Sequence, residues 1–208
     1  MTTADLLALI ATSFSHRPQP VAGGVLFCHT PHVGELAYLG RVYDPVSTER
    51  ARAWSARAHN QRNPYVSFVT AVANGLRIAN IDLYGVIEQI DRSIGPGIGQ
   101  PISLDYGNLV ERPANLHDTD MVIGAIVGWS SRGAYVMTHE GAVRLVHYSN
   151  GGDVADEWPN LEAMLRAELT RVAELHDPEG RELCPSADLM HPNGRRWETK
   201  SEPGSVRH

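Results

Sequence analysis

The stretch MVIGAIVGWSSRGAYVMTHEGAVRLVHY, residues 121–148, is the clearest β region of the sequence. It opens with a short, continuous apolar run, 122–127, which is typical of a strand buried on both faces. Two further apolar stretches flank His139-Glu140-Gly141, where the glycine tolerates a positive φ angle. The pattern therefore predicts a buried strand followed by an antiparallel hairpin.

The final helix is expected over residues 161–175, where apolar residues recur at helical spacing. Pro159 suits its first turn, and Asp156 and Glu157 stand where the dipole of a helix favours negative charge. We expect this helix to present one continuous apolar face to a sheet.

Earlier segments give shorter patterns. Helices are expected from residue 3 to about 15, from about 47 to 59, and from Asn63-Pro64 to a stop at Asn74-Gly75. Short strands are expected within residues 21–43, and one strand from 76 to 86.

Composition excludes several classes of protein. The chain has 208 residues, 42% of them hydrophobic, which is enough for a core and argues against wholesale disorder. Its net charge of −6 argues against a dedicated nucleic-acid binder. Two cysteines make no disulfide framework, the N-terminus lacks the pattern of a signal peptide, and no apolar run is long enough to span a membrane. We therefore expect a cytoplasmic protein that does not associate with membranes.

Catalytic motifs are weak. Cys28, His29 and His32 are possible zinc ligands, but a zinc site needs three or four ligands and no second Cys/His pair has matching spacing. Nothing resembles a general acid and base held together in a pocket. We expect no catalytic residues, no bound metal and no cofactor, and a metal-dependent hydrolase using these three residues remains an alternative.

Residues from about 63 to 180 resemble the SUKH superfamily, whose founding members include yeast regulators of cell-wall synthesis. Three motifs carry the resemblance in order: an aromatic helix that ends in Asn-Gly and leads to a Leu-Tyr-Gly turn, a Val-Ile-Gly strand followed by a hairpin, and the final amphipathic helix. Their residues are Tyr65, Phe68, Asn74, Gly75, Leu83, Tyr84 and Gly85, then Val122, Gly124, Gly133, Tyr135, Gly141 and Val143, then 161–175.

The resemblance implies an α+β fold, in which a mostly antiparallel sheet has helices packed on one side and the C-terminal helix closes the domain. On this basis residues 1–62 form an N-terminal helical extension, 63–184 the SUKH-like core and 185–208 a flexible tail. The motif residues are expected to be structural: Gly75, Gly85 and Gly141 in turns, and Phe68, Leu83, Tyr135 and Leu165 in the core.

Bacterial members of this superfamily are typically immunity proteins, so the resemblance implies a non-enzymatic protein that binds and neutralises a cognate toxin domain of the nuclease or deaminase class. An acidic surface would complement a basic toxin. The candidate contact residues are exposed acids and one aromatic: Asp82, Glu88, Asp91, Asp118, Asp120, Trp129, Asp153, Asp156 and Glu157. A SUKH-type adaptor that links other cellular or phage proteins is the alternative.

Overall fold

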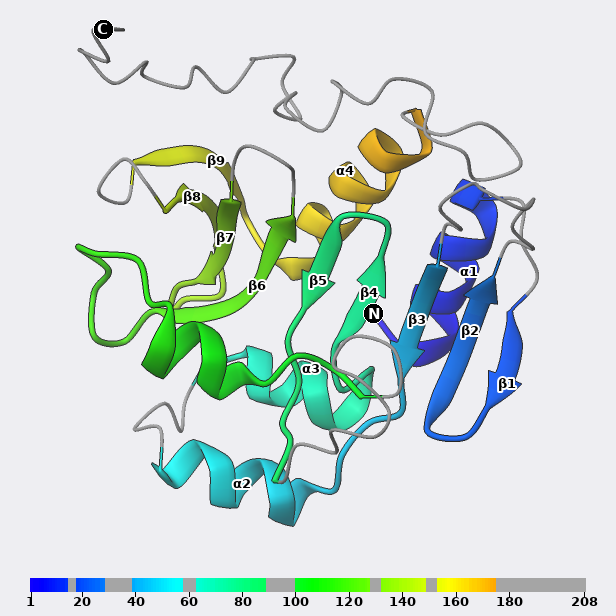
Figure 1. Ribbon diagram of the computed structural model, residues 1–208, viewed down its shortest axis with the longest axis horizontal. Helices are drawn as coiled ribbons and strands as arrows, with labels where there is room; N and C mark the ends of the chain where they lie inside the picture. Colours follow the sequence, from blue (N-terminus) through cyan, green and yellow to red (C-terminus); the bar gives the residue numbers. More distant parts are fainter. Residues whose placement is uncertain are drawn as a thin grey trace, which may run out of the picture.

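The computed structural model describes residues 1–14, 18–28, 39–57, 63–88, 100–127, 132–148 and 153–174. These residues build one nine-stranded sheet in which every strand pairs antiparallel with the next along the chain (Figure 1). The strands are β1 (Gln19–Val21), β2 (Gly24–Cys28), β3 (Leu39–Tyr43), β4 (Leu76–Ile78), β5 (Ile81–Leu83), β6 (Met121–Val127), β7 (Arg132–Met137), β8 (Val143–His147) and β9 (Val154–Trp158).

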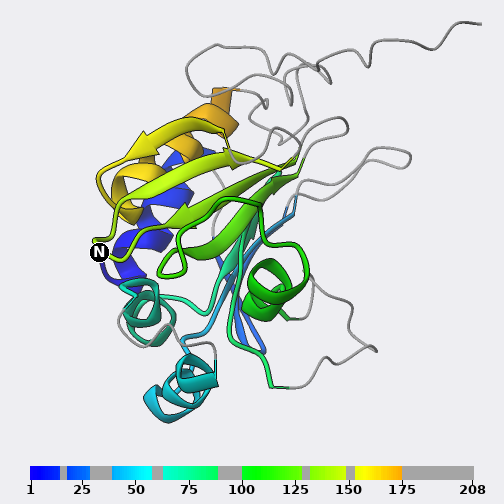
Figure 2. The ribbon, with the colours of Figure 1, turned by 90° about the vertical axis from the view of Figure 1, so that its left-hand side faces the viewer.

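The helices take different positions around this sheet. They are α1 (Thr3–Phe14), α2 (Thr48–Arg57), α3 (Tyr65–Ala71), α4 (Leu161–Glu174) and the short π-helical turn η1 (Tyr106–Val110). Helices α1 and α4 lie side by side on one face, whereas η1 lies against the opposite face (Figure 2). Helices α2 and α3 pack together at one end of the sheet (Figure 1). The expected α+β fold with a C-terminal helix is confirmed.

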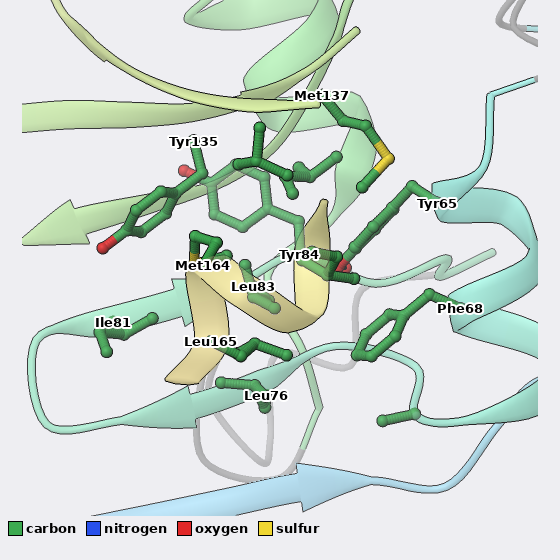
Figure 3. Packing of buried hydrophobic residues seen from close by; sticks show 14 of the residues in the cluster. Tyr65, Phe68, Leu76, Ile81, Leu83, Tyr84, Tyr135, Met137, Met164 and Leu165 are labelled. Atoms are coloured by element: carbon green, nitrogen blue, oxygen red, sulfur yellow. The ribbon is translucent and has the colours of Figure 1, made fainter. Parts of the chain in front are cut away.

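The main core lies between the sheet and the helices. Met164 and Leu165 of α4 point toward Leu83 of β5, and Tyr65 and Phe68 approach from α3 (Figure 3). The rings of Tyr65 and Phe68 stack with centroids 5.3 Å apart. The Tyr65 hydroxyl donates a hydrogen bond to the Tyr84 carbonyl oxygen at 2.6 Å, so this buried polar group is satisfied. These contacts confirm that Phe68, Leu83 and Leu165 are core residues.

A buried polar cluster joins α4 to the sheet. The Glu168 side chain is fully buried and accepts a hydrogen bond from the Tyr135 hydroxyl at 2.5 Å. Arg171 lies one turn further along α4, pairs with Glu168 at 2.8 Å and donates to the Asn80 side chain at 3.1 Å. The buried charges are therefore matched, and the cluster fixes α4 against β7 and the β4–β5 turn.

The glycines of the SUKH-like motifs have identifiable structural roles. Gly75 has φ +85°, and a Cβ atom there would lie 2.5 Å from the Leu83 carbonyl oxygen. Gly141 has φ +97° in the β7–β8 turn, as the hairpin pattern predicts. Gly85 does not need a positive φ, but a Cβ atom there would lie 2.3 Å from the Asn74 carbonyl oxygen. Close backbone approach explains this third glycine.

One expectation about secondary structure was wrong, and one strand was not predicted. Residues 76–83 form a tight hairpin of β4 and β5 instead of one strand, and Ala79 in its turn takes a left-handed conformation (φ 50°) that a non-glycine residue rarely adopts. Asp156 and Glu157 precede α4, as expected, but they belong to strand β9, which the sequence pattern did not predict. This short strand shows little alternation of exposed and buried residues, so its sequence carries no clear strand signal.

The ends of the chain relate differently to the sheet. The stretch 1–62 contributes α1, α2 and the strands β1, β2 and β3, of which β3 pairs with β4. The expected tail, 185–208, lies outside the described residues. Among the helices that the structure describes, none has the length and apolar character needed to cross a bilayer.

Candidate functional site

A row of polar residues crosses the sheet on the face opposite α1 and α4, which we call the cavity face. Side chains alternate along a strand, and Ile81 and Leu83 belong to the core beneath α4, so Asp82 between them points to the other face. Arg77 of β4 is the cross-strand partner of Asp82, and Ala125 of β6 is its partner on the other side. The hairpin therefore places a cation and an anion side by side next to a small residue.

A cavity of about 460 Å³ opens on this face. Among the described residues that line it are three charged ones, Arg77, Asp82 and Glu111. Ala125, Gln100 and Pro101 also line the cavity. The three charged residues together carry one negative charge when all of them are ionised.

The chain segment 100–111 builds the outer wall of the cavity. The Gly85 amide donates to the Ile102 carbonyl at 2.8 Å, and the Leu104 amide donates to the Gly85 carbonyl at 2.9 Å. These bonds continue the sheet beyond β5 and bring Tyr106 and Glu111 to the mouth of the cavity. The Leu-Tyr-Gly motif thus has a role in shaping the cavity as well as in turning the chain.

Three tyrosines, Tyr84, Tyr106 and Tyr148, line the cavity. Burial, together with the neighbouring Tyr148 hydroxyl, raises the pKa of Tyr84, which stays neutral. The Tyr106 hydroxyl donates to a carboxylate oxygen of Glu111 at 2.5 Å and fixes that side chain at the mouth. Aromatic side chains and carboxylates therefore line the same open cavity.

Asp82 is the most unusual group of the site. Its residue is 4% exposed, and its carboxylate lies 3.6 Å from the Arg77 Nε atom, which is too far for a hydrogen bond. Burial raises the pKa of Asp82 from its ordinary value of 3.8 to about 6, and Arg77 opposes that shift only in part. A buried carboxylate with so little compensation is typical of a binding or catalytic position.

A second aromatic and basic pair lies beside this cavity. Arg41 of β3 is the cross-strand partner of Arg77 and lies over the ring of Tyr43, 5.2 Å from its centroid. The Arg41 guanidinium donates to the Ala22 carbonyl oxygen at 2.7 Å, so the turn between β1 and β2 holds it. Burial raises the pKa of Tyr43 to about 12. Neither Arg41 nor Tyr43 is among the residues that line the cavity, and Asp82 is the acidic group of the row.

Two of the predicted contact acids are buried, although both were expected at exposed positions. Asp82 lines the cavity, as described above. Asp120 is 6% exposed, and its carboxylate accepts a hydrogen bond from the His117 amide at 3.3 Å. Since the Asp120 amide in turn donates to the His117 carbonyl at 2.9 Å, Asp120 closes a turn before β6 and its role is structural.

The other predicted acids that the structure describes are at least partly exposed and do not form one cluster. Glu88 pairs with Arg50 at 3.3 Å, and Glu157 pairs with Arg144 at 3.1 Å. Asp153, Asp156 and Glu157 come together on or beside the edge strand β9, whereas Asp118 lies in the turn before β6. The predicted Asp91 and Trp129 lie outside the described residues.

The alternative metal site cannot be built from the described residues. His29, His32 and the Cys28 side chain all lie outside them. Within the part of the chain that the structure describes, no three histidine, cysteine or acidic side chains gather as they would around a metal ion.

Sequence reasoning missed most of the cavity. Arg77 and Asp82 occupy the middle of two three-residue strands, each between apolar residues, and a hairpin interpretation would have placed them opposite each other. Tyr106 and Glu111 had no such signal, because the contacts of Gly85 with 102–104 and of Asn108 with Val122 bring them to the sheet.

Comparison of the chain with protein-family models, with curated proteins and with solved structures found no match.

Proposed function

We propose that this protein is a non-enzymatic immunity protein of the SUKH type, which binds a basic surface of a cognate toxin domain in the cytoplasm and blocks it. The observation that carries the proposal is the cavity on the sheet face that α1 and α4 leave uncovered, with its excess of negative charge. The order of the SUKH-like motifs along the chain supports the same class of protein.

The electrostatics favour a basic partner at two levels. The whole chain carries a net charge of −6, which would steer a basic protein toward it and raise the rate of association. Closer in, Asp82 and Glu111 offer carboxylates inside the cavity, and Asp153 and Asp156 add charge at the β9 edge. A toxin that acts on nucleic acid carries basic residues for its substrate, and these are the groups that such a surface would cover.

The architecture also suits inhibition by binding. The cavity walls come from paired strands and from backbone hydrogen bonds of Gly85, so little ordering is required when a partner binds. Pre-organisation of this kind raises affinity because less conformational entropy is lost on association.

Co-expression with the toxin domain encoded beside this gene tests the proposal. The wild-type chain is expected to restore growth and to co-purify with the toxin as a stable complex. The double variant Asp82→Asn/Glu111→Gln, which keeps the shape of the cavity and removes its negative charge, is expected to weaken both effects. Glu140→Gln, at an exposed acid in the β7–β8 turn outside the cavity, is the matched control. Failure of the wild-type chain to restore growth, together with no complex, would overturn the proposed function.

A further inference from the structure

We infer that the cavity is a specificity pocket for one arginine side chain of the partner, whose guanidinium lies against Asp82, Glu111 and the tyrosines while its stem packs on Ile87 and Ile102. This inference rests on the proposed function for the identity of the partner, but the pocket itself can be tested without any toxin.

The first argument is the burial of the Asp82 carboxylate beside a single, distant ion-pair partner. The Asp82 side chain is 6% exposed, yet Arg77 stands at 3.6 Å with its own side chain 36% exposed. An ionised carboxylate can accept about four hydrogen bonds, and its burial is unfavourable unless they are made. A guanidinium brings five donors in a rigid plane and can bond a carboxylate through two of them at once. A partner arginine would therefore compensate a group that Arg77 leaves largely uncompensated.

The second argument is the composition of the walls. Tyr84, Tyr106 and Tyr148 offer aromatic faces, on which a planar cation stacks favourably. Ile87 and Ile102 provide apolar surface for the three methylene groups of an arginine stem. A lysine ammonium would gain the charge interaction but neither the stacking nor the bidentate geometry.

The third argument is the sign of the charge. Among the described residues of the lining, an anionic ligand would meet two carboxylates, Asp82 and Glu111, and one cation, Arg77. Glu111 is held toward the mouth by the Tyr106 hydroxyl at 2.5 Å, so a cation entering the cavity meets a carboxylate already in place. Arginine is also among the residues that most often anchor protein interfaces in buried pockets.

The experiment is an NMR titration of the full chain with a capped Gly-Arg-Gly peptide and with the same peptide containing citrulline, which has the shape of arginine without its charge. We expect saturable binding of the arginine peptide with a Kd of about 1–10 mM and shifts centred on Asp82 and Ala125. Because one charge-assisted contact is lost, the citrulline peptide should bind at least about tenfold more weakly.

Three variants separate charge from shape. Asp82→Asn is expected to weaken arginine binding by about tenfold or more. Ala125→Leu fills the wall of the cavity without removing a charge and is expected to abolish binding. Glu140→Gln should bind as the wild type does, because Glu140 is exposed in the β7–β8 turn and does not line the cavity. Thermal unfolding of each variant verifies that it is folded, and Glu111→Gln provides a second charge variant.

Equal binding of the two peptides, no saturable binding up to about 50 mM, or shifts centred away from the cavity would overturn the inference. If the wild-type chain rescues growth but does not bind the arginine peptide, the inference fails and the proposed function stands. If it binds the peptide and does not rescue growth, the pocket stands and the proposed function fails.

Discussion

Replacing Asp82 by asparagine is expected to stabilise the protein at neutral pH, which is the opposite of the usual effect of changing a buried residue. Burial raises the pKa of Asp82 from 3.8 to about 6, so the folded state binds the proton more tightly than the unfolded state does. Each pKa unit corresponds to about 1.36 kcal/mol, and the ionised carboxylate therefore lowers the free energy of unfolding by about 3 kcal/mol at pH 7. Asparagine keeps the shape without the charge.

The pH dependence of the stability difference shows in which direction Asp82→Asn acts. Because the pKa is higher in the folded state, the wild type is most stable relative to Asp82→Asn below pH 3.8 and loses that advantage as the pH rises to about 6. The gain from the substitution should be about 3 kcal/mol at pH 7, or about 6–12 °C in Tm, and under about 1 kcal/mol near pH 4. Loss of the ion pair adds little, because the Arg77 side chain is 36% exposed and reaches water.

Thermal and urea unfolding at pH 4 and pH 7 measure this difference. Asp120→Asn is the matched control, since Asp120 is equally buried but accepts a hydrogen bond from the His117 amide, and its replacement should not stabilise. If Asp82→Asn proves less stable than the wild type at pH 7, or if the gain is the same at both pH values, then the carboxylate is well compensated and the reasoning is refuted.

Two further predictions concern the framework. Gly75→Ala should lower the free energy of unfolding by about 2–4 kcal/mol, because its Cβ would lie 2.5 Å from the Leu83 carbonyl oxygen. Gly141→Ala should lower it by about 1 kcal/mol, because the Cβ there would make only an ordinary van der Waals contact, 3.6 Å from Pro64 Cγ. Urea unfolding of both variants measures the difference. Equal losses would show that the loss comes from the positive φ angle alone and not from the close contact at Gly75. Tyr135→Phe should lower the free energy of unfolding by about 1–3 kcal/mol, since Glu168 loses the hydrogen bond from the tyrosine hydroxyl inside the core; a loss below about 0.5 kcal/mol would contradict that assignment.

Regular elements with strong periodicity could be predicted from the sequence. Residues 121–148 alternate and turn as three antiparallel strands do, and Gly141 takes the expected positive φ. The apolar residues of α4 recur at helical spacing and are buried. In these segments the local pattern and the tertiary environment agree, so the sequence alone is sufficient.

Elsewhere a tertiary contact overrides the local signal. Ala79-Asn80 is not a usual hairpin turn, and part of its stability comes from Asn80 accepting a hydrogen bond from Arg171, 91 residues away. The site could not be predicted in full for the same reason. Asp82 was predicted as a contact residue, but its burial, its neighbour Arg77 and the distant Glu111 depend on a hairpin and a loop packing that no local pattern encodes.

The contrast between the two buried acids bears on why the cavity exists. Asp120 is placed so that its oxygen accepts a backbone hydrogen bond, and its burial serves the fold. Asp82 is buried to a similar extent with a single ion pair at 3.6 Å, so the fold is less stable for having it. If this position only had to cover the sheet, an apolar side chain would give a more stable fold than Asp82. Since the same cavity also holds Glu111 and three tyrosines, the lost stability is understandable if those groups bind something together. A variant that becomes more stable and at the same time loses the arginine peptide would link the two effects to one carboxylate.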